Sequence, residues 1–210
     1  MATCVFELRV QFSVVYMKSN MSKETEKPKP VFVLSVLLIL LKCKYFSCLP
    51  QTEPPDVTKF YVKDAKIWIV NTTMFTSKFC EMDFVWTTSM KYAFFDRSYL
   101  GNHTTHKEKL LGQFKKTDIS KVYDAMMVAQ YHGTSFQSMD QLLYSYQSYT
   151  CGIFNVTLFT EPRGSYYDMR VKQSEVAHPN SSCIEMFEQL SERRNVTTLY
   201  NNTCQTISQH

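Results

Sequence analysis

Residues 154–158 read Phe-Asn-Val-Thr-Leu, a strict alternation of apolar and polar side chains. This alternation predicts a β-strand with one buried face, because successive strand residues point to opposite sides of a sheet. Asn155 also begins an Asn-Val-Thr glycosylation sequon, and a glycan attached there must face water. Both signals turn Phe154, Val156 and Leu158 toward the interior of the protein.

Seven other segments show a similar strand-like pattern at short spacing. Together with turns such as Leu100-Gly-Asn102, they predict an all-β fold in which eight antiparallel strands close into a barrel. The predicted strands cover residues 67–71, 80–86, 91–100, 107–115, 124–132, 141–149, 152–159 and 165–173.

The orientation of the first strand is predicted from a second sequon, at Asn71. A glycan on Asn71 must face water, so strict alternation would turn Trp68 and Val70 inward. Residues of other strands also share apolar faces: Cys80, Met82, Phe84 and Trp86; Leu110, Gly112 and Phe114; Ala125, Met127, Ala129 and Tyr131; Leu142, Tyr144 and Tyr146.

A helix is predicted after the strands, from about Ser182 to Arg193. Ser182 and Glu185 have the spacing of a capping box, and an apolar stripe at i, i+3, i+4 and i+7 follows. The stripe begins at Cys183, which we expect to face the barrel and to meet a strand cysteine. The stripe consists of Cys183, Met186, Phe187 and Leu190.

The head of the chain predicts export. The apolar run Val31–Leu41 follows Lys27 and Lys29 and is too short to span a bilayer, as is typical of a signal peptide. Because Lys42 and Lys44 follow the run at once, an uncleaved anchor is the alternative. We divide the chain into residues 1–48, an upstream extension and signal peptide, and residues 49–210, one folded domain.

Glycosylation sequons and cysteines are frequent in the domain, as in secreted proteins. An even set of cysteines in such a chain predicts disulfide bonds, and four cysteines allow three pairings. The cysteines are Cys80, Cys151, Cys183 and Cys204. The sequons of the domain begin at Asn71, Asn102, Asn155, Asn180, Asn195 and Asn201.

Several function classes lack support in the sequence. The net charge is only +4 and forms no basic stripe of the kind that nucleic acid binding needs. No nucleophile motif, phosphate-binding loop or metal-ligand pattern indicates catalysis, a cofactor or a metal. We expect a secreted, extracellular monomer that is not an enzyme and binds neither nucleic acid nor, after signal cleavage, a membrane.

The order of four segments resembles the tick salivary lipocalins, the family of the histamine-binding proteins. The resemblance covers residues 55–205 and implies a lipocalin barrel with the C-terminal helix packed on its outside. It further implies the pairing Cys80–Cys204 and Cys151–Cys183, and a role in sequestering a small host mediator. The segments are Cys151-Gly-Ile153, Ser165-Tyr-Tyr-Asp-Met-Arg-Val-Lys172, Cys183 and Val196-Thr-Thr-Leu-Tyr-Asn-Asn-Thr-Cys204.

The resemblance also implies ligand-binding positions. Amine-binding members carry a carboxylate directly after the strand cysteine, where this chain has Gly152. A second carboxylate position corresponds to Asp168, although Arg170 replaces the family's aromatic residue there. Glu108 lies in a segment that resembles an amine-contacting strand. Alternation alone would instead put Asp168 outside, with Tyr167, Met169 and Val171 inward, and Glu108 on the rim.

Aromatic residues complete the candidate site. Tyr131, Tyr146 and Trp68 could bracket a flat ring or could simply pack in the core. The leading hypothesis is capture of a biogenic amine, histamine or serotonin, because a desolvated ammonium needs a carboxylate partner. The alternatives are an acidic lipid held by Arg170, such as a leukotriene or fatty acid, and a lipocalin that inhibits complement or clotting proteins through its loops.

Overall fold

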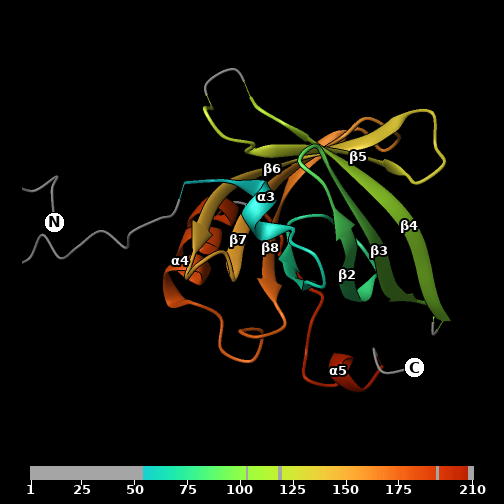
Figure 1. The fold of residues 1–210 in the computed structure, drawn as a ribbon. Helices are drawn as coiled ribbons and strands as arrows, with labels where there is room; N and C mark the ends of the chain where they lie inside the picture. Colours follow the sequence, from blue (N-terminus) through green and yellow to red (C-terminus); the bar gives the residue numbers. More distant parts are fainter. Residues whose placement is uncertain (1–53, 103, 118–119, 193, 208–210) are drawn as a thin grey trace, which may run out of the picture. The chain divides into compact units, whose positions relative to one another are not determined.

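Eight antiparallel strands pair in the order β2-β3-β4-β5-β6-β7-β8-β1, and β1 also pairs with β2, which closes the sheet into the predicted barrel (Figure 1). A computed structural model describes residues 54–102, 104–117, 120–192 and 194–207. The strands are β1 (Lys66–Thr72), β2 (Phe79–Thr88), β3 (Tyr92–Gly101), β4 (Thr104–Lys115), β5 (Ala125–Gln130), β6 (Phe136–Tyr146), β7 (Cys151–Leu158) and β8 (Gly164–Lys172), with the short β9 (Thr197–Thr198) added beside β1.

A short helix, α3 (Val57–Phe60), contributes to the interior of the barrel. The Asp56 side chain caps it by accepting a hydrogen bond from the Thr58 backbone N–H. Phe60 and Tyr61 are both fully buried among interior residues of the strands. The first residues of the domain therefore fill part of the barrel.

Two groups of buried side chains divide the protein. The interior group lies inside the barrel and contains residues of α3 together with Ile67, Val85, Phe95, Leu110, Phe114, Met126, Val128, Leu142, Phe154 and Val156. The outer group lies between the barrel and the C-terminal part of the chain and contains Trp68, Met82, Tyr146, Ile153, Met169, Val171, Phe187 and Tyr200. The inward orientation predicted for Phe154 and Val156 is confirmed.

The C-terminal part of the chain covers the outer group. Helix α4 (Ser181–Ser191) contacts β6, β7 and β8 (Figure 1), so a helix packed on the outside of the barrel is confirmed. Cys151 bonds to Cys183 on this helix, and Cys80 on β2 bonds to Cys204 at the start of α5 (Cys204–Ile207). This is the pairing that the family resemblance implies.

The start of α4 differs from the prediction. Asn180 is the N-cap, and its side chain accepts a hydrogen bond from the Cys183 backbone N–H at 3.2 Å. Ser182 lies inside the helix, so the predicted capping box is wrong. Asn caps helices as well as Ser does, and the cap therefore sits two residues earlier than the Ser182 signal indicates.

The predicted orientation of β1 is also wrong, because of a β-bulge. The register of β1 against β8 shifts between Ile69 and Asn71. Asn71 pairs with Met169 of the outer group, and Trp68 lies in the same group. Since a bulge breaks the strict alternation, Asn71 and Trp68 lie on one side of the sheet and Ile67 faces the interior.

Two further strands depart from the expected faces. In β6 the register shifts between Leu142 and Tyr144, so Leu142 is interior whereas Tyr144 and Tyr146 belong to the outer group. In β5 the interior residues are Met126 and Val128. The predicted Ala125–Met127–Ala129–Tyr131 face therefore points away from the interior.

The predicted signal peptide and its Lys27, Lys29, Lys42 and Lys44 flanks lie outside the described residues, so they remain predictions. No helix among the residues that the structure describes is long and apolar enough to cross a lipid bilayer.

Candidate functional site

Charged side chains occupy the centre of the barrel. Apart from Asp124, which precedes β5 and binds Thr117 and Gln141, four carboxylates and one arginine are at most 5% exposed: Glu81, Asp83, Asp140, Asp168 and Arg170. A second arginine, Arg97 on β3, has a side chain that is 13% exposed. Buried charges are costly unless they are paired, so the partners of each group decide what this interior can bind.

Arg170 on β8 lies in a cage that we define by four side chains: Asp140, Asp168, Tyr61 and Phe154. Its Nη2 lies 2.9 Å from Asp168 Oδ2 and 2.8 Å from Asp140 Oδ2. Its Nη1 donates a hydrogen bond to the Tyr61 hydroxyl at 2.8 Å. The guanidinium carbon lies 4.4 Å from the centre of the Phe154 ring, a cation–π distance.

The second arginine, Arg97, forms a separate ion pair in the interior. Arg97 binds Asp83 with two hydrogen bonds, from Nε at 2.7 Å and from Nη2 at 2.8 Å. Tyr61 links this ion pair to Arg170, because its hydroxyl also donates to Asp83 Oδ2 at 2.7 Å. The interior charges therefore form one network that runs from Asp140 to Asp83.

Glu81 and Asp168 are the least well neutralised members of the network. Burial raises the pKa of Glu81, and neither Arg97 at 3.8 Å nor Lys78 at 3.3 Å cancels the effect. Burial likewise raises the pKa of Asp168 despite its contact with Arg170. The negative charge of Asp168 adds to the raised pKa of Glu81, which indicates that each would gain from a further cation.

Asp83 is better satisfied, and Asp140 has one of its two oxygens in a hydrogen bond. Burial alone would raise the pKa of Asp83, but the charge and hydrogen bonds of Arg97 outweigh it and hold that pKa below its ordinary value. Asp140 Oδ1 accepts a hydrogen bond from Ser138 at 2.6 Å. Its Oδ2 makes the close ion pair with Arg170 at an angle outside hydrogen-bond geometry.

Of the residues proposed from the sequence, Asp168 and Arg170 lie together in this network. Asp168 therefore lies inside the barrel, as the family resemblance implies. The alternation argument, which placed Asp168 outside, is wrong. Glu108 pairs with Arg97 in the β3–β4 register and is half-buried. It shares the interior face with Leu110, and its register neighbour Arg97 belongs to the network.

The three aromatic candidates lie outside the barrel. Trp68 packs on Tyr200 at 5.0 Å and donates its indole N–H to Gln173 at 2.6 Å. Tyr146 is in the outer group, buried, and its hydroxyl has no hydrogen-bond partner among the described residues. These positions exclude Trp68 and Tyr146 from lining the interior in this structure.

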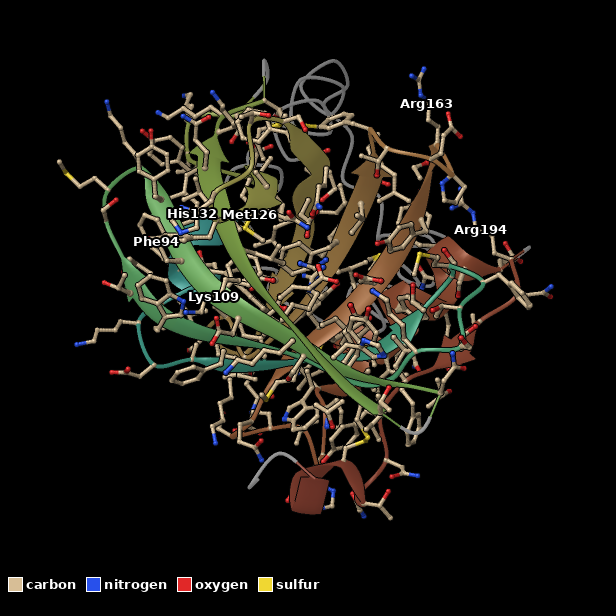
Figure 2. The ribbon with its side chains drawn as sticks, turned by 90° about the vertical axis from the view of Figure 1, so that its right-hand side faces the viewer. Phe94, Lys109, Met126, His132, Arg163 and Arg194 are labelled. Carbon is tan, nitrogen blue, oxygen red and sulfur yellow. A yellow bond between two sulfur atoms is a disulfide. The ribbon has the colours of Figure 1, made fainter. Side chains whose placement is uncertain are left out.

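Tyr131 belongs to an outer aromatic group together with Trp86, Phe94 and His132. Its ring lies 5.8 Å from those of Trp86 and Phe94 and 4.4 Å from that of His132. Phe94 and His132 of this group are labelled in Figure 2. Tyr131 is 37% exposed, so this group is a surface feature and Tyr131 does not reach the interior.

Gly152 lies at the position where the family resemblance implies a carboxylate, and the structure shows what surrounds it. A Cβ atom at this position would lie 2.8 Å from the Phe60 ring and 2.9 Å from Leu142. Phe60 of α3 therefore occupies the space beside Gly152, and a larger side chain would displace it.

Five members of the interior network escaped the sequence analysis: Glu81, Asp83, Arg97, Asp140 and Tyr61. Glu81 and Asp83 alternate with apolar residues of β2, a pattern that normally indicates an outward polar face. Asp140 was accessible to inference, because it has the same strand parity as the interior residue Leu142. No sequence signal indicated Tyr61.

The sequons differ in exposure. Asn102, Asn195 and Asn201 are exposed, whereas Asn71, Asn155 and Asn180 are half-buried. Asn71 Oδ1 is buried without a hydrogen-bond partner among the described residues. Glycosylation at each site remains a prediction, and exposure favours the first three.

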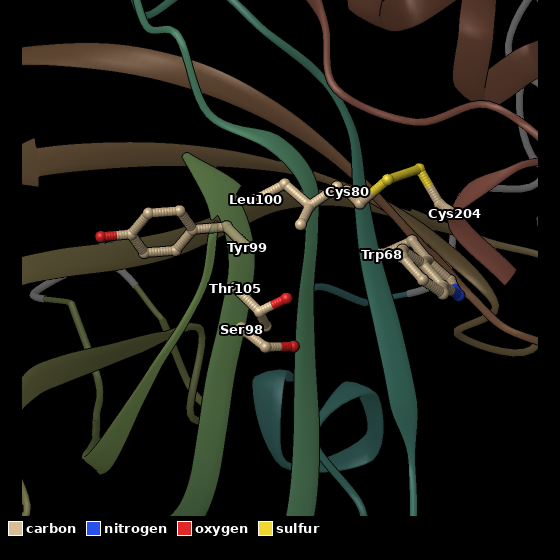
Figure 3. A pocket seen from close by; sticks show the side chains of 7 residues that line it. All are labelled: Trp68, Cys80, Ser98, Tyr99, Leu100, Thr105 and Cys204. Carbon is tan, nitrogen blue, oxygen red and sulfur yellow. A yellow bond between two sulfur atoms is a disulfide. The ribbon is translucent and has the colours of Figure 1, made fainter. Parts of the chain in front are cut away.

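A hollow lies on the outer side of the barrel, beside the Cys80–Cys204 disulfide, Trp68 and Leu100 (Figure 3). Its volume is about 40 Å³. Ligand pockets usually measure roughly 300–1,000 Å³, so this hollow has room for a few water molecules and not for an organic mediator.

Comparison with known proteins gives a family and a fold. A family model described as tick histamine binding protein matches residues 55–206. The serotonin complex of AM182 has a TM-score of 0.52 and 16% identity, covering 74% of this chain and 93% of that chain. Japanin from Rhipicephalus appendiculatus, bound to cholesterol, has a TM-score of 0.49 and 9% identity, covering 69% and 98%. No curated protein sequence matches the chain significantly.

Proposed function

The chain belongs to the tick histamine-binding protein family, and from this premise we propose that it sequesters a small cationic mediator, a biogenic amine such as histamine or serotonin, inside its barrel. The role is binding and not catalysis. In the host, removal of such a mediator would suppress inflammation and defence.

The observation that carries the proposal is the charge balance of the interior. Four buried carboxylates face two arginines, and Lys78, 31% exposed, reaches only Glu81 from the surface. Even with Lys78 counted, one negative charge is therefore unbalanced at the centre of the barrel. A ligand ammonium between Glu81 and Asp168 would supply the missing cation and form charge-assisted hydrogen bonds.

Ligand entry would require side chains to move. Tyr61, Phe60 and Leu142 are at most 1% exposed and fill the interior together with the ionic network. A binding-competent open state would be a minor population, and its rarity would lower the apparent affinity in proportion.

The charge balance also favours an amine over an acidic lipid. Arg170, the residue that we considered for an acidic head group, is already paired with Asp140 and Asp168. A carboxylate ligand would have to displace one of these partners and would add a further negative charge to an interior that already has an excess.

Export to the extracellular space is part of the proposal. Two disulfides stabilise the fold, and disulfides form and persist mainly in oxidising compartments. Exposed sequons at Asn102, Asn195 and Asn201 are compatible with passage through the secretory pathway.

A second candidate function is binding of a host protein, such as a complement or clotting factor. The outer aromatic group of Trp86, Phe94, Tyr131 and His132 supports it, because aromatic residues are enriched at the energetic centres of protein interfaces. In that case the interior network would be structural.

Calorimetric titration with histamine, serotonin, cholesterol and a fatty acid tests the proposal. We expect heat with an amine and a loss of affinity of at least about thirtyfold in Glu81→Gln and Asp168→Asn, because truncating a buried charge pair costs about 2–5 kcal/mol. Glu188→Gln on the exposed face of α4 is the matched control and should bind normally. Unchanged affinity in both interior variants would contradict the proposal.

A further inference from the structure

The surroundings of the Arg170 head group have the composition of a cation-binding site. Two carboxylates, a tyrosine hydroxyl and an aromatic face converge on it from four different elements: β6, β8, the residue after α3, and β7. Aromatic faces and carboxylates are the groups that recognise free organic cations. Here the cation that they hold is part of the chain.

We propose that Arg170 is a tethered occupant of a cation site, the cage of Asp140, Asp168, Tyr61 and Phe154, and that this cage accepts a free alkylguanidinium or alkylammonium ion when the side chain is removed. The side chain acts as a built-in competitor. It thereby sets which cations the barrel can hold, by restricting a ligand to the space beside Arg170.

The charges of the cage support the proposal. Its two carboxylates carry two negative charges and the Arg170 guanidinium supplies one positive charge, so the cage stays negative even when occupied. Without Arg170, two acids would lie in a desolvated interior with Arg97 as the remaining buried arginine. Such a pair must either take up protons or bind another cation, because a buried charge without a partner is costly.

The position of Arg170 favours a role as an occupant of the cage over a role in stabilising the fold alone. Arg170 is fully buried, and its stem rises from β8 beside Gly152 and Ile69, its register neighbours. Buried ion pairs often add little stability compared with apolar packing of the same volume. Stability by itself therefore gives a weak explanation for three such pairs at the centre of the barrel.

The test uses Arg170→Ala and ethylguanidinium, which replaces the atoms that the substitution removes. We expect ethylguanidinium to bind Arg170→Ala at least about tenfold more tightly than it binds the native protein, measured by calorimetry and by the rise in melting temperature. N-ethylurea has a similar shape without charge and should bind neither protein. Adding Asp140→Asn to Arg170→Ala removes one wall of the cage and should weaken the gain about tenfold or more.

Equal effects of ethylguanidinium on the two proteins, or of ethylguanidinium and N-ethylurea on the variant, would overturn the proposal. If Arg170→Ala does not fold by itself, the refolding yield with each compound becomes the measurement. Recovery with the cation alone supports the cage. If neither compound restores folding, Arg170→Gln is titrated with methylammonium, and a lack of gain over the native protein overturns the proposal.

This result is independent of the proposed function. A native protein that binds neither histamine nor serotonin would contradict amine sequestration, whereas Arg170→Ala could still bind ethylguanidinium. A variant that shows no gain would contradict the tethered cation and leave amine binding by the native protein untouched.

Discussion

Glu81 and Asp83 lie two residues apart on the same face of β2, but their electrostatic surroundings are opposite. Burial raises the pKa of Glu81, whereas Arg97 and Tyr61 hold the pKa of Asp83 below its ordinary value. Folding therefore disfavours the charge on Glu81 and favours the charge on Asp83. Asp83 is a structural anchor of the network, and Glu81 is the residue that we propose as a ligand contact.

The two carboxylates should respond differently to neutral substitution. Asp83→Asn leaves the buried Arg97 without its bidentate partner and should lower the free energy of unfolding by about 3–5 kcal/mol. Glu81→Gln removes a charge that folding disfavours and should cost little or stabilise the protein. Urea denaturation of both variants measures the difference. Equal losses of stability would show that the two residues have the same role.

Acidification should release a bound amine before the protein unfolds. Glu81 and Asp168 have pKa values above their ordinary 4.5 and 3.8, so both gain protons as the pH falls through those raised values, and the interior loses its attraction for an ammonium ion. Protonation of these two groups adds stability as the pH falls, since their folded pKa values are raised. Asp83 loses its contribution only below 3.8.

Calorimetry and urea denaturation at matched pH values check this order of events. Serotonin is the ligand for this test, because its ammonium stays protonated throughout and its indole does not titrate in this range, so a fall in affinity reports the carboxylates. An affinity that persists down to the pH of unfolding would argue that neither Glu81 nor Asp168 contacts the ligand.

Among the elements, the strands were predictable and their faces only in part. Alternation or, for residues 91–100, aromatic content indicated the strands, and β7 was oriented correctly by the agreement of Phe154 with the sequon Asn155. In β1 and β6 the bulges after Ile69 and Leu142 reversed the expected faces. A bulge depends on pairing with a neighbouring strand, so the period of a single strand does not reveal it.

The N-cap of α4 gives a prediction with an internal control. Asn180→Ala removes both the cap and the sequon, whereas Ser182→Ala removes the sequon and keeps the cap. We expect Asn180→Ala to lower the free energy of unfolding by about 1 kcal/mol, the usual cost of losing an N-cap. Ser182→Ala should leave it nearly unchanged. Equal losses in urea denaturation would point to the glycan and not to the cap.

For the whole molecule, the sequence was enough to predict the barrel and the family. It was not enough to predict which charged side chains face the interior of the barrel. The family resemblance predicted that Asp168 and Arg170 face the interior. It did not indicate that Glu81, Asp83 and Asp140 would join them, because those positions depend on which face of β2 and β6 turns inward. An eight-stranded barrel can hold one small ligand, but here α3 and the ionic network fill that space.

The central claim is that the excess of interior carboxylates holds a ligand's positive charge. A crystal structure of the protein with serotonin or histamine tests it most directly. We predict the ligand ammonium within hydrogen-bond distance of Asp168 or Glu81, about 3 Å, with side chains of the interior displaced to admit the ring. A ligand on the outer aromatic group, or an interior unchanged at saturating amine, would contradict the account.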